Sequence, residues 1–266
     1  MQCLPADVSP LTCATLATYT CLVNQTTWNK PPARASLRVH VAPDREAPIQ
    51  YAFSWQVLLE YRDLLLKGLL MTVKLSVLGF VLSAALGVIV GLCRLSSNKV
   101  LSTAARAYVE FFRNVPLVVQ IFFLYFGLGM SSFGAGLLGL VLYSAPYIAE
   151  IIRSGIASIP RAQFEAAHAS GLGPLQVTRY VVLPQAIGIV LPPLATEGVN
   201  LIKNTAIALT VGVEELTFMT QEIDSITFRG FEAATAATLI YVALCFVILQ
   251  AVALLERHLK VASRVM

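Results

Sequence analysis

The chain has 266 residues, of which 57% are hydrophobic and 13% are charged, and its formal net charge is +4. A soluble globular domain carries about 25% charged residues. The composition therefore excludes an ordinary soluble protein and predicts an all-α integral membrane protein, with several helices long enough to cross roughly 30 Å of hydrocarbon. The mild charge gives no reason to expect a nucleic-acid partner. The five cysteines lack CxxC spacing, so we expect no metal site and no cofactor.

The first fifty residues differ from the rest of the chain. They are rich in Pro, Thr, Ala and Arg and show no sustained helical period. They also lack the basic, apolar and cleavage regions of a signal peptide. We interpret residues 1–50 as a disordered tail or the product of a mis-assigned start, followed by one transmembrane domain over residues 51–266.

From residue 51 onward the pattern is that of membrane helices. Tyr51, Phe53 and Trp55 begin an amphipathic stretch that predicts an interfacial helix, because aromatic side chains favour the headgroup region of a bilayer. Five apolar segments follow, each long enough to span the bilayer. The expected spans are about 68–94, 104–129, 136–158, 178–201 and 233–255.

The connections between these spans differ in charge. The first carries Arg94, Lys99 and Arg106, and the third carries Arg161 and Arg179, whereas the second is uncharged and the fourth is mostly acidic. Further basic residues follow the fifth span. Because basic loops stay in the cytoplasm, the sequence predicts a multi-pass protein of the cytoplasmic membrane with its amino terminus outside and its carboxyl terminus in the cytoplasm.

The third connection contains the stretch "IPRAQFEAAHASGL". Pro160 suits the start of a helix, and Gly171 and Gly173 end it, so a helix of about 161–172 is expected outside the membrane. Its alanines give a small-profile surface that fits the groove of another protein. The residues alone leave two interpretations open: a contact helix for a partner, or a helix that only joins two spans.

The same stretch resembles the EAA motif of ATP-binding-cassette (ABC) importer permeases, E-A-A-x3-G-x9-I-x-L-P. One position departs from the motif, because Val181 replaces the usual Ile. The motif positions are Glu165, Ala166, Ala167, Gly171, Val181, Leu183 and Pro184. The segments "AYVEFFRNVPLVVQIFFLYFG" and "PPLATEGVNLIKNTAIALTVGVEELT" resemble polar amino acid permeases of the histidine, glutamine and glutamate type, and the resemblance covers about residues 51–260.

This resemblance implies the fold of a type I ABC importer transmembrane domain, with about five spans and a cytoplasmic coupling helix. It also implies a bacterial inner-membrane location and several partners: an ABC ATPase subunit, an extracytoplasmic amino acid-binding protein, a second permease that is a copy or a paralogue, a polar amino acid substrate and membrane lipid. The chain has no GxxxxGK[ST] motif, so ATP hydrolysis is expected on the partner and not on this chain.

Polar and charged side chains inside the spans are candidate substrate contacts, because they are costly in hydrocarbon. Glu150 lies in the third span, where Arg153 one turn on is an alternative ion-pair partner. At the end of the fourth span, Glu197, Asn200 and Lys203 lie at intervals of three and share one helical face, and Asn204 follows directly. These four candidates offer both an acceptor for an ammonium group and donors for a carboxylate, and a structural pairing between Glu197 and Lys203 is the alternative.

Other readings of the chain stay open. The composition does not exclude an importer for another polar solute, such as an opine. An ion-coupled secondary transporter is a further alternative, although no internal repeat is visible, and a membrane enzyme would need a His and carboxylate constellation that the sequence lacks. Gly79, Gly87 and Gly91 lie on one face of the first span, where we expect close packing against the second permease.

Overall fold

The structure is a computed structural model that describes residues 52–264, with side chains described up to Leu254. The expected tail, residues 1–50, lies outside this part. Every regular element of the described residues is helical. The elements are α2 (Gln56–Glu60), α3 (Arg62–Leu95), α4 (Lys99–Asn114), α5 (Leu117–Phe122), η1 (Phe123–Gly127), α6 (Ser132–Ala157), α7 (Arg161–Ala169), α8 (Pro174–Val177), η2 (Thr178–Val182), α9 (Leu183–Asn204), η3 (Thr205–Val211), α10 (Leu216–Thr227) and α11 (Gly230–Arg264).

Four continuous helical segments of the described residues are long and apolar enough to cross a membrane. They are α3, α6, the run from α8 to η3, and α11 up to Leu254. A fifth span exists if α4 and the segment Leu117–Gly127 cross together, but these two parts meet at a bend of 102°. The second expected span, 104–129, which was predicted as one helix, is therefore divided into two parts.

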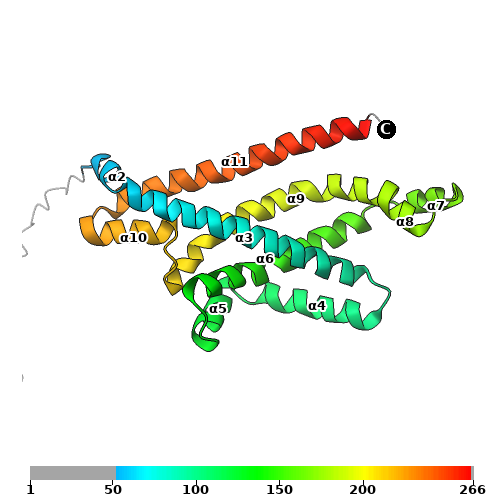
Figure 1. Cartoon of the computed structure of the whole chain (residues 1–266), viewed down its shortest axis with the longest axis horizontal. Coiled ribbons are helices and arrows are strands. Elements are labelled where there is room, and N and C mark those ends of the chain that lie inside the picture. The colour runs from blue at the N-terminus through cyan, green and yellow to red at the C-terminus, as the bar shows by residue number, and fades with distance from the viewer. Residues whose placement is uncertain (1–51, 265–266) are drawn as a thin grey trace, which may run out of the picture. The chain divides into compact units, whose positions relative to one another are not determined.

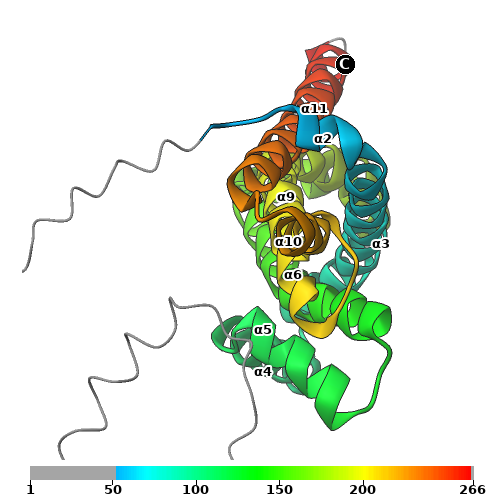
Figure 2. The ribbon, with the colours of Figure 1, turned by 90° about the vertical axis from the view of Figure 1, so that its left-hand side faces the viewer.

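The spanning helices run between two ends of a bundle (Figure 1). α3, α6 and α11 run toward the end that carries α7 and α8, and α9 returns to the end that carries α2 and α10. Seen from the α10 end, α10 covers the middle of the bundle between α3 and α11, and α4 and α5 lie to one side (Figure 2). The loops that sequence analysis assigns to opposite sides of the membrane therefore lie at opposite ends.

α3 and α6 pack backbone against backbone. A Cβ atom on Gly87 would lie 2.7 Å from the Cβ atom of Ile148, and one on Gly91 would lie 2.9 Å from the carbonyl oxygen of Ala149. Real Cβ atoms do not approach other atoms this closely, so glycine is needed at both positions. The glycine face of α3 is thus covered by α6 of the same chain, and our expectation that it packs against a second permease was wrong.

The break between α4 and α5 is built around Pro116. Proline has no N–H group, so the carbonyl of Phe112, four residues earlier, loses its helical donor. The side chain of Gln120 replaces it: its Nε2 donates to the Phe112 carbonyl at 3.1 Å and to the Val115 carbonyl at 3.0 Å. Gln120 is buried, so one side chain satisfies two carbonyls that the bend would otherwise leave without partners.

α10 occupies a segment that was expected to be an acidic connection. Its N-terminus is capped by Glu215, whose carboxylate accepts hydrogen bonds from the amides of Thr217 at 2.9 Å and Phe218 at 2.8 Å, and from the Tyr241 hydroxyl at 2.7 Å. Glu215 is fully buried, and this burial raises the pKa of its carboxyl group, against the effect of the hydrogen bonds. Capping and burial together fix α10 against α3 and α11.

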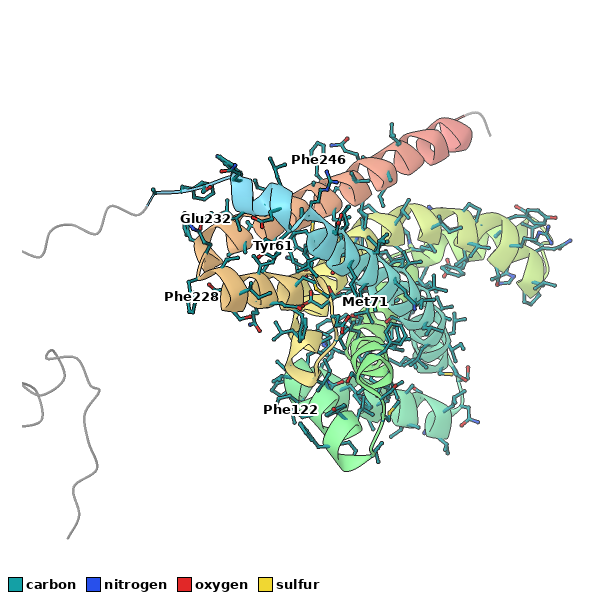
Figure 3. All side chains as sticks on the ribbon, turned by 60° about the vertical axis from the view of Figure 1, so that its left-hand side comes forward. Tyr61, Met71, Phe122, Phe228, Glu232 and Phe246 are labelled. Carbon is teal, nitrogen blue, oxygen red and sulfur yellow. The ribbon has the colours of Figure 1, made fainter. Side chains whose placement is uncertain are left out.

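Large apolar side chains point outward from the bundle. Phe122 on α5 and Phe246 on α11 are examples (Figure 3), and Phe246 is 60% exposed. In the apolar 18-residue stretch that makes each helix long enough to span a membrane, only 6% of α11 is buried, whereas 56% of α6 is buried. This is the pattern of a protein whose surroundings are hydrocarbon or another apolar subunit, with α6 at its centre.

Candidate functional site

The first candidate site is α7, a nine-residue helix at one end of the bundle. Pro160 is its N-cap residue, where the absence of an N–H group costs nothing. Ala167 is its only buried residue. Glu165 and Ala166, two of the motif positions, are exposed, so the helix presents a face of one carboxylate and small side chains that its own chain leaves uncovered.

α7 ends in a tight turn that depends on Gly171. The Gly171 amide donates to the His168 carbonyl at 2.9 Å, and the Leu172 amide donates to the Ala167 carbonyl at 3.2 Å. These two bonds form a Schellman motif. Gly171 has a φ of +78°, in the left-handed region where L-residues with a Cβ atom are strained. Glycine at this motif position is therefore required by the backbone.

A buried apolar cluster holds α7 against the ends of two long helices. Ala167 of α7 belongs to one buried cluster with Ile159 after α6, Val177 of α8, Val182 of η2 and Ala186 of α9. The motif position Val181 packs against the same cluster, while Leu183 and Pro184 are exposed at the start of α9. The helix expected over 161–172 is shorter in the structure, where it covers Arg161–Ala169. It ends there because Ser170 and Gly171 already belong to the turn. The cluster thus links α7 to the adjoining ends of α6 and α9.

The second candidate site is a polar cavity of about 390 Å³ between α6 and α9. Its walls bring together four side chains expected from the sequence and two that were not. The lining residues are Tyr143, Tyr147, Glu197, Asn200, Lys203 and Asn204. The two tyrosines lie four residues apart in α6, so they share one helical face. Sequence reasoning missed them because an aromatic residue in an apolar helix carries no distinctive signal.

Glu197 is the buried acid of this cavity, with 7% of its surface exposed. Asn200 Nδ2 donates to its Oε2 atom at 3.5 Å, and its Oε1 atom has no hydrogen-bond partner in the described part of the chain. The ion pairs found among the described residues do not include one between Glu197 and Lys203. The buried carboxylate thus keeps one oxygen available, and the Lys203 ammonium lines the same cavity.

A second cavity of about 350 Å³ shares Tyr147, Glu197 and Asn200 with the first. Arg113 lines it and stacks over the Tyr147 ring at 5.1 Å from the centroid. Glu150 also lines it, but both carboxylate oxygens already have partners: Arg94 donates to Oε2, and Arg153 donates to Oε1 from Nη2 at 2.5 Å. The two cavities adjoin at these three shared residues along α6 and α9, and together they are called the polar groove below. No group of three His, Cys, Asp or Glu side chains among residues 52–254 is arranged to hold a metal ion.

Comparison with known proteins identifies the family. Residues 83–261 match the family of binding-protein-dependent transport system inner membrane components. A probable amino-acid ABC transporter permease, PatM of Vibrio harveyi, is 40% identical over 197 residues, which are 71% of this chain and 88% of PatM. The glutamine transport system permease GlnP of Escherichia coli K12 is 34% identical over 216 residues, 79% of this chain and 99% of GlnP.

A solved structure agrees in fold. An amino acid ABC transporter crystallised with histidines aligns with a TM-score of 0.73 and 33% identity, covering 78% of this chain and all of that one. The match confirms the expected type I importer fold. Since the family match covers more than half of the sequence, the chain belongs to the binding-protein-dependent transport system inner membrane components: it is a multi-pass permease subunit of an ABC importer, and its partners are a separate ATPase and a substrate-binding protein.

Proposed function

We propose that this permease carries a polar L-amino acid into the cytoplasm, powered by an ATPase subunit that docks on α7. The observation that carries the proposal is α7 itself: an exposed face with Glu165 and Ala166, fixed by the Gly171 turn and by a buried cluster that reaches α6 and α9. A movement of a helix held in this way would be passed on to the spanning helices α6 and α9. In the proposed cycle, ATP binding draws two such helices together and opens the pathway outward, and hydrolysis resets it.

The proposed orientation places α7 in the cytoplasm and α2 and α10 outside, with the amino terminus outside and the carboxyl terminus inside. The alternation of basic connections supports it. A cysteine introduced at Phe228, which is 88% exposed at the α10 end (Figure 3), should react with a membrane-impermeant maleimide in spheroplasts, in a background without the native cysteines. A cysteine at Ala169 on α7 should react only after the membrane is opened. The reverse pattern would contradict this orientation.

The proposed substrate site is the outer part of the polar groove. Glu197 would accept hydrogen bonds from the α-ammonium group, because it is buried with one oxygen unpaired. Lys203 and Asn204 would hold the α-carboxylate, and Asn200 would position Glu197 through the 3.5 Å contact. Of the five candidates, Glu150 is the least suited to bind an ammonium group, since two arginines already engage it.

A second permease, either a copy of this chain or a paralogue, completes the proposed pathway. The amino acid-binding protein would deliver its ligand at the α10 end. The relatives support an amino acid as the solute, since PatM and GlnP are named for amino acid and glutamine transport.

Uptake into liposomes tests the proposal. Liposomes that contain this chain, its partner permease and the ATPase would receive the binding protein outside, ATP inside, and a panel of labelled amino acids with one opine. We expect ATP-dependent accumulation of a polar amino acid that an ionophore does not abolish. Uptake that continues without ATP and stops with the ionophore would indicate a secondary transporter, and selective uptake of the opine alone would refute the amino acid assignment.

A further inference from the structure

Glu150 is shared by arginines from two different helices. Arg153, one turn further along α6, donates from Nε at 3.1 Å and from Nη2 at 2.5 Å to the Oε1 atom. Arg94, the penultimate residue of α3, donates to the Oε2 atom. The Arg94 side chain is only 13% exposed, against 31% for Glu150 and 35% for Arg153. This is a largely shielded, charge-assisted contact between helices, which is stronger than an exposed surface pair.

Arg94 also holds a third helix. The Ser102 hydroxyl in α4 donates to the Arg94 carbonyl at 3.2 Å. The side chain of Arg94 therefore reaches α6 while its backbone binds α4. Arg94 thus connects the ends of α3 and α4 nearest α7 to α6, at Glu150, about two turns before α6 ends.

The contact lies at the end of the glycine seam, the face of α3 on which Gly87 and Gly91 pack against α6. Gly87, Gly91 and Arg94 fall on one face of α3, at intervals of four and three. The two glycines bring α3 against Ile148 and Ala149 of α6, and Arg94 follows on the same face with the ion pair to Glu150. The seam fixes the separation of the two helices, and the ion pair fixes their register at the α7 end.

α6 is followed closely in the chain by α7. Three residues separate the last residue of α6 from the first of α7, and one of them, Ile159, is buried in the same cluster as Ala167. α7 does not contact α3 through this cluster, whose members come from the segments after α6. Force applied at α7 reaches α6 and α9 through the cluster. α3 packs on both of these helices: Gly79 and Phe80, near its middle, lie against Leu201 and Gly198 of α9, whereas at the end nearest α7 the Arg94 side chain joins α3 to α6.

The geometry points to Arg94 as a positioning residue that clamps α3 and α4 to α6 through Glu150, so that these helices move with α7 as one body when the ATPase acts. The clamp rests on the proposed function, because it requires α7 to be the ATPase contact. Glu150 is then a structural partner of Arg94 and not a ligand for the transported solute. Arg153 has a lesser role, since it binds Glu150 from within α6.

A distance measurement in the assembled complex tests the clamp without knowledge of the solute. Spin labels go on cysteines introduced at two exposed positions, Ser97, two residues after α3, and Ala157, the last residue of α6. The native cysteines of the chain are replaced. The complex with the ATPase is measured without nucleotide and after trapping with ATP and vanadate. The variants are Arg94→Met, the matched control Arg153→Met, which removes the other arginine from the same carboxylate, and Arg94→Lys, which restores a cation.

We expect the same label distance in both nucleotide states for the unmodified chain and for Arg153→Met. Arg94→Met should shift the distance by about 2 Å or more on trapping, the scale of helix shifts in switching transitions, and Arg94→Lys should reverse most of that shift. An unchanged distance in Arg94→Met, or a nucleotide-dependent shift in the unmodified chain, would overturn the clamp.

The same preparation separates a failure of the clamp from a failure of the proposed function. Retention of the ATPase is scored for each variant and for Glu165→Lys on α7. If Glu165→Lys loses the ATPase and Arg94→Met shows no shift, α7 is the ATPase contact and only the clamp is wrong. If Glu165→Lys retains the ATPase fully, the docking assignment is wrong, and with it the basis of the clamp.

Discussion

At the scale of single residues, Gly171 sets the shape of α7. Its positive φ of +78° is unfavourable for a residue with a Cβ atom by roughly 1–2 kcal/mol, and more for a β-branched one. We expect Gly171→Val to weaken ATPase binding about tenfold or more, because about 1.4 kcal/mol corresponds to a factor of ten, while membrane insertion stays intact. Titration of the detergent-solubilised permease with purified ATPase measures this.

Gly173 provides the control for that measurement. It lies two residues further on with an ordinary φ of −69°, and a Cβ atom there would come only within 3.7 Å of a neighbouring atom. Gly173→Val should therefore bind the ATPase nearly as well as the unmodified chain. Equal affinities for the two variants would show that the left-handed turn has no part in docking.

Glu197 decides whether the groove binds the solute. Loss of a hydrogen bond to a charged group costs about 1.5–3 kcal/mol, so Glu197→Gln should raise the KM for uptake by roughly 10- to 100-fold at unchanged expression. The control is Glu214→Gln, because the Glu214 carboxylate pairs with Lys67 outside the groove. This variant should leave the KM unchanged. A fall in the amount of folded protein with no change in KM would mean that Glu197 is structural.

The sequence located part of this groove and missed the rest. Glu197, Asn200 and Lys203 stand out because polar groups are rare and costly in an apolar helix. Tyr143 and Tyr147 do not stand out, and only the packing of α6 against α9 brings them to the same cavity. Of the two partners of Glu150, Arg153 could be predicted from the sequence because it lies one helical turn away. Arg94 could not be predicted, because it lies in another helix.

At the scale of elements, the 102° bend between α4 and α5 depends on Gln120. Gln120→Leu would leave the partly buried carbonyls of Phe112 and Val115 without their donor, and an unsatisfied group costs up to about 1–3 kcal/mol when it is buried. We expect Gln120→Leu to have a lower midpoint of thermal unfolding in detergent than the control Gln221→Leu, which changes an exposed glutamine on α10. Equal midpoints would contradict the role we give to Gln120.

The elements show why long helices were easier to predict than their interruptions. α3, α6 and α11 follow from long apolar runs, because only a helix satisfies its backbone inside hydrocarbon. The broken span was missed because Pro116 is compatible with a kinked helix, and the sequence does not reveal that Gln120 supplies the missing donor. α10 was missed because its acidic side chains suggested a loop, whereas Glu215 is in fact a buried cap.

At the scale of the whole molecule, the permease separates its functions along its length. α7 lies at one end and α10 at the other (Figure 1), and the polar groove runs along α6 and α9 between them. α6 belongs to each part: it lines the groove, packs on α3 and leads into α7. This arrangement lets a movement at one end change the shape of a cavity inside the bundle, provided that the helices are fastened to each other.

The most direct test of this account is whether the carboxylate of α7 is needed to hold the ATPase. Permease carrying Glu165→Lys, and permease carrying Glu60→Lys at an exposed position of α2, would each be purified from membranes that also contain the ATPase. We predict that the Glu60→Lys protein brings the ATPase with it and the Glu165→Lys protein does not. Full recovery of the ATPase with both variants would contradict the claim that energy from ATP enters this permease through α7.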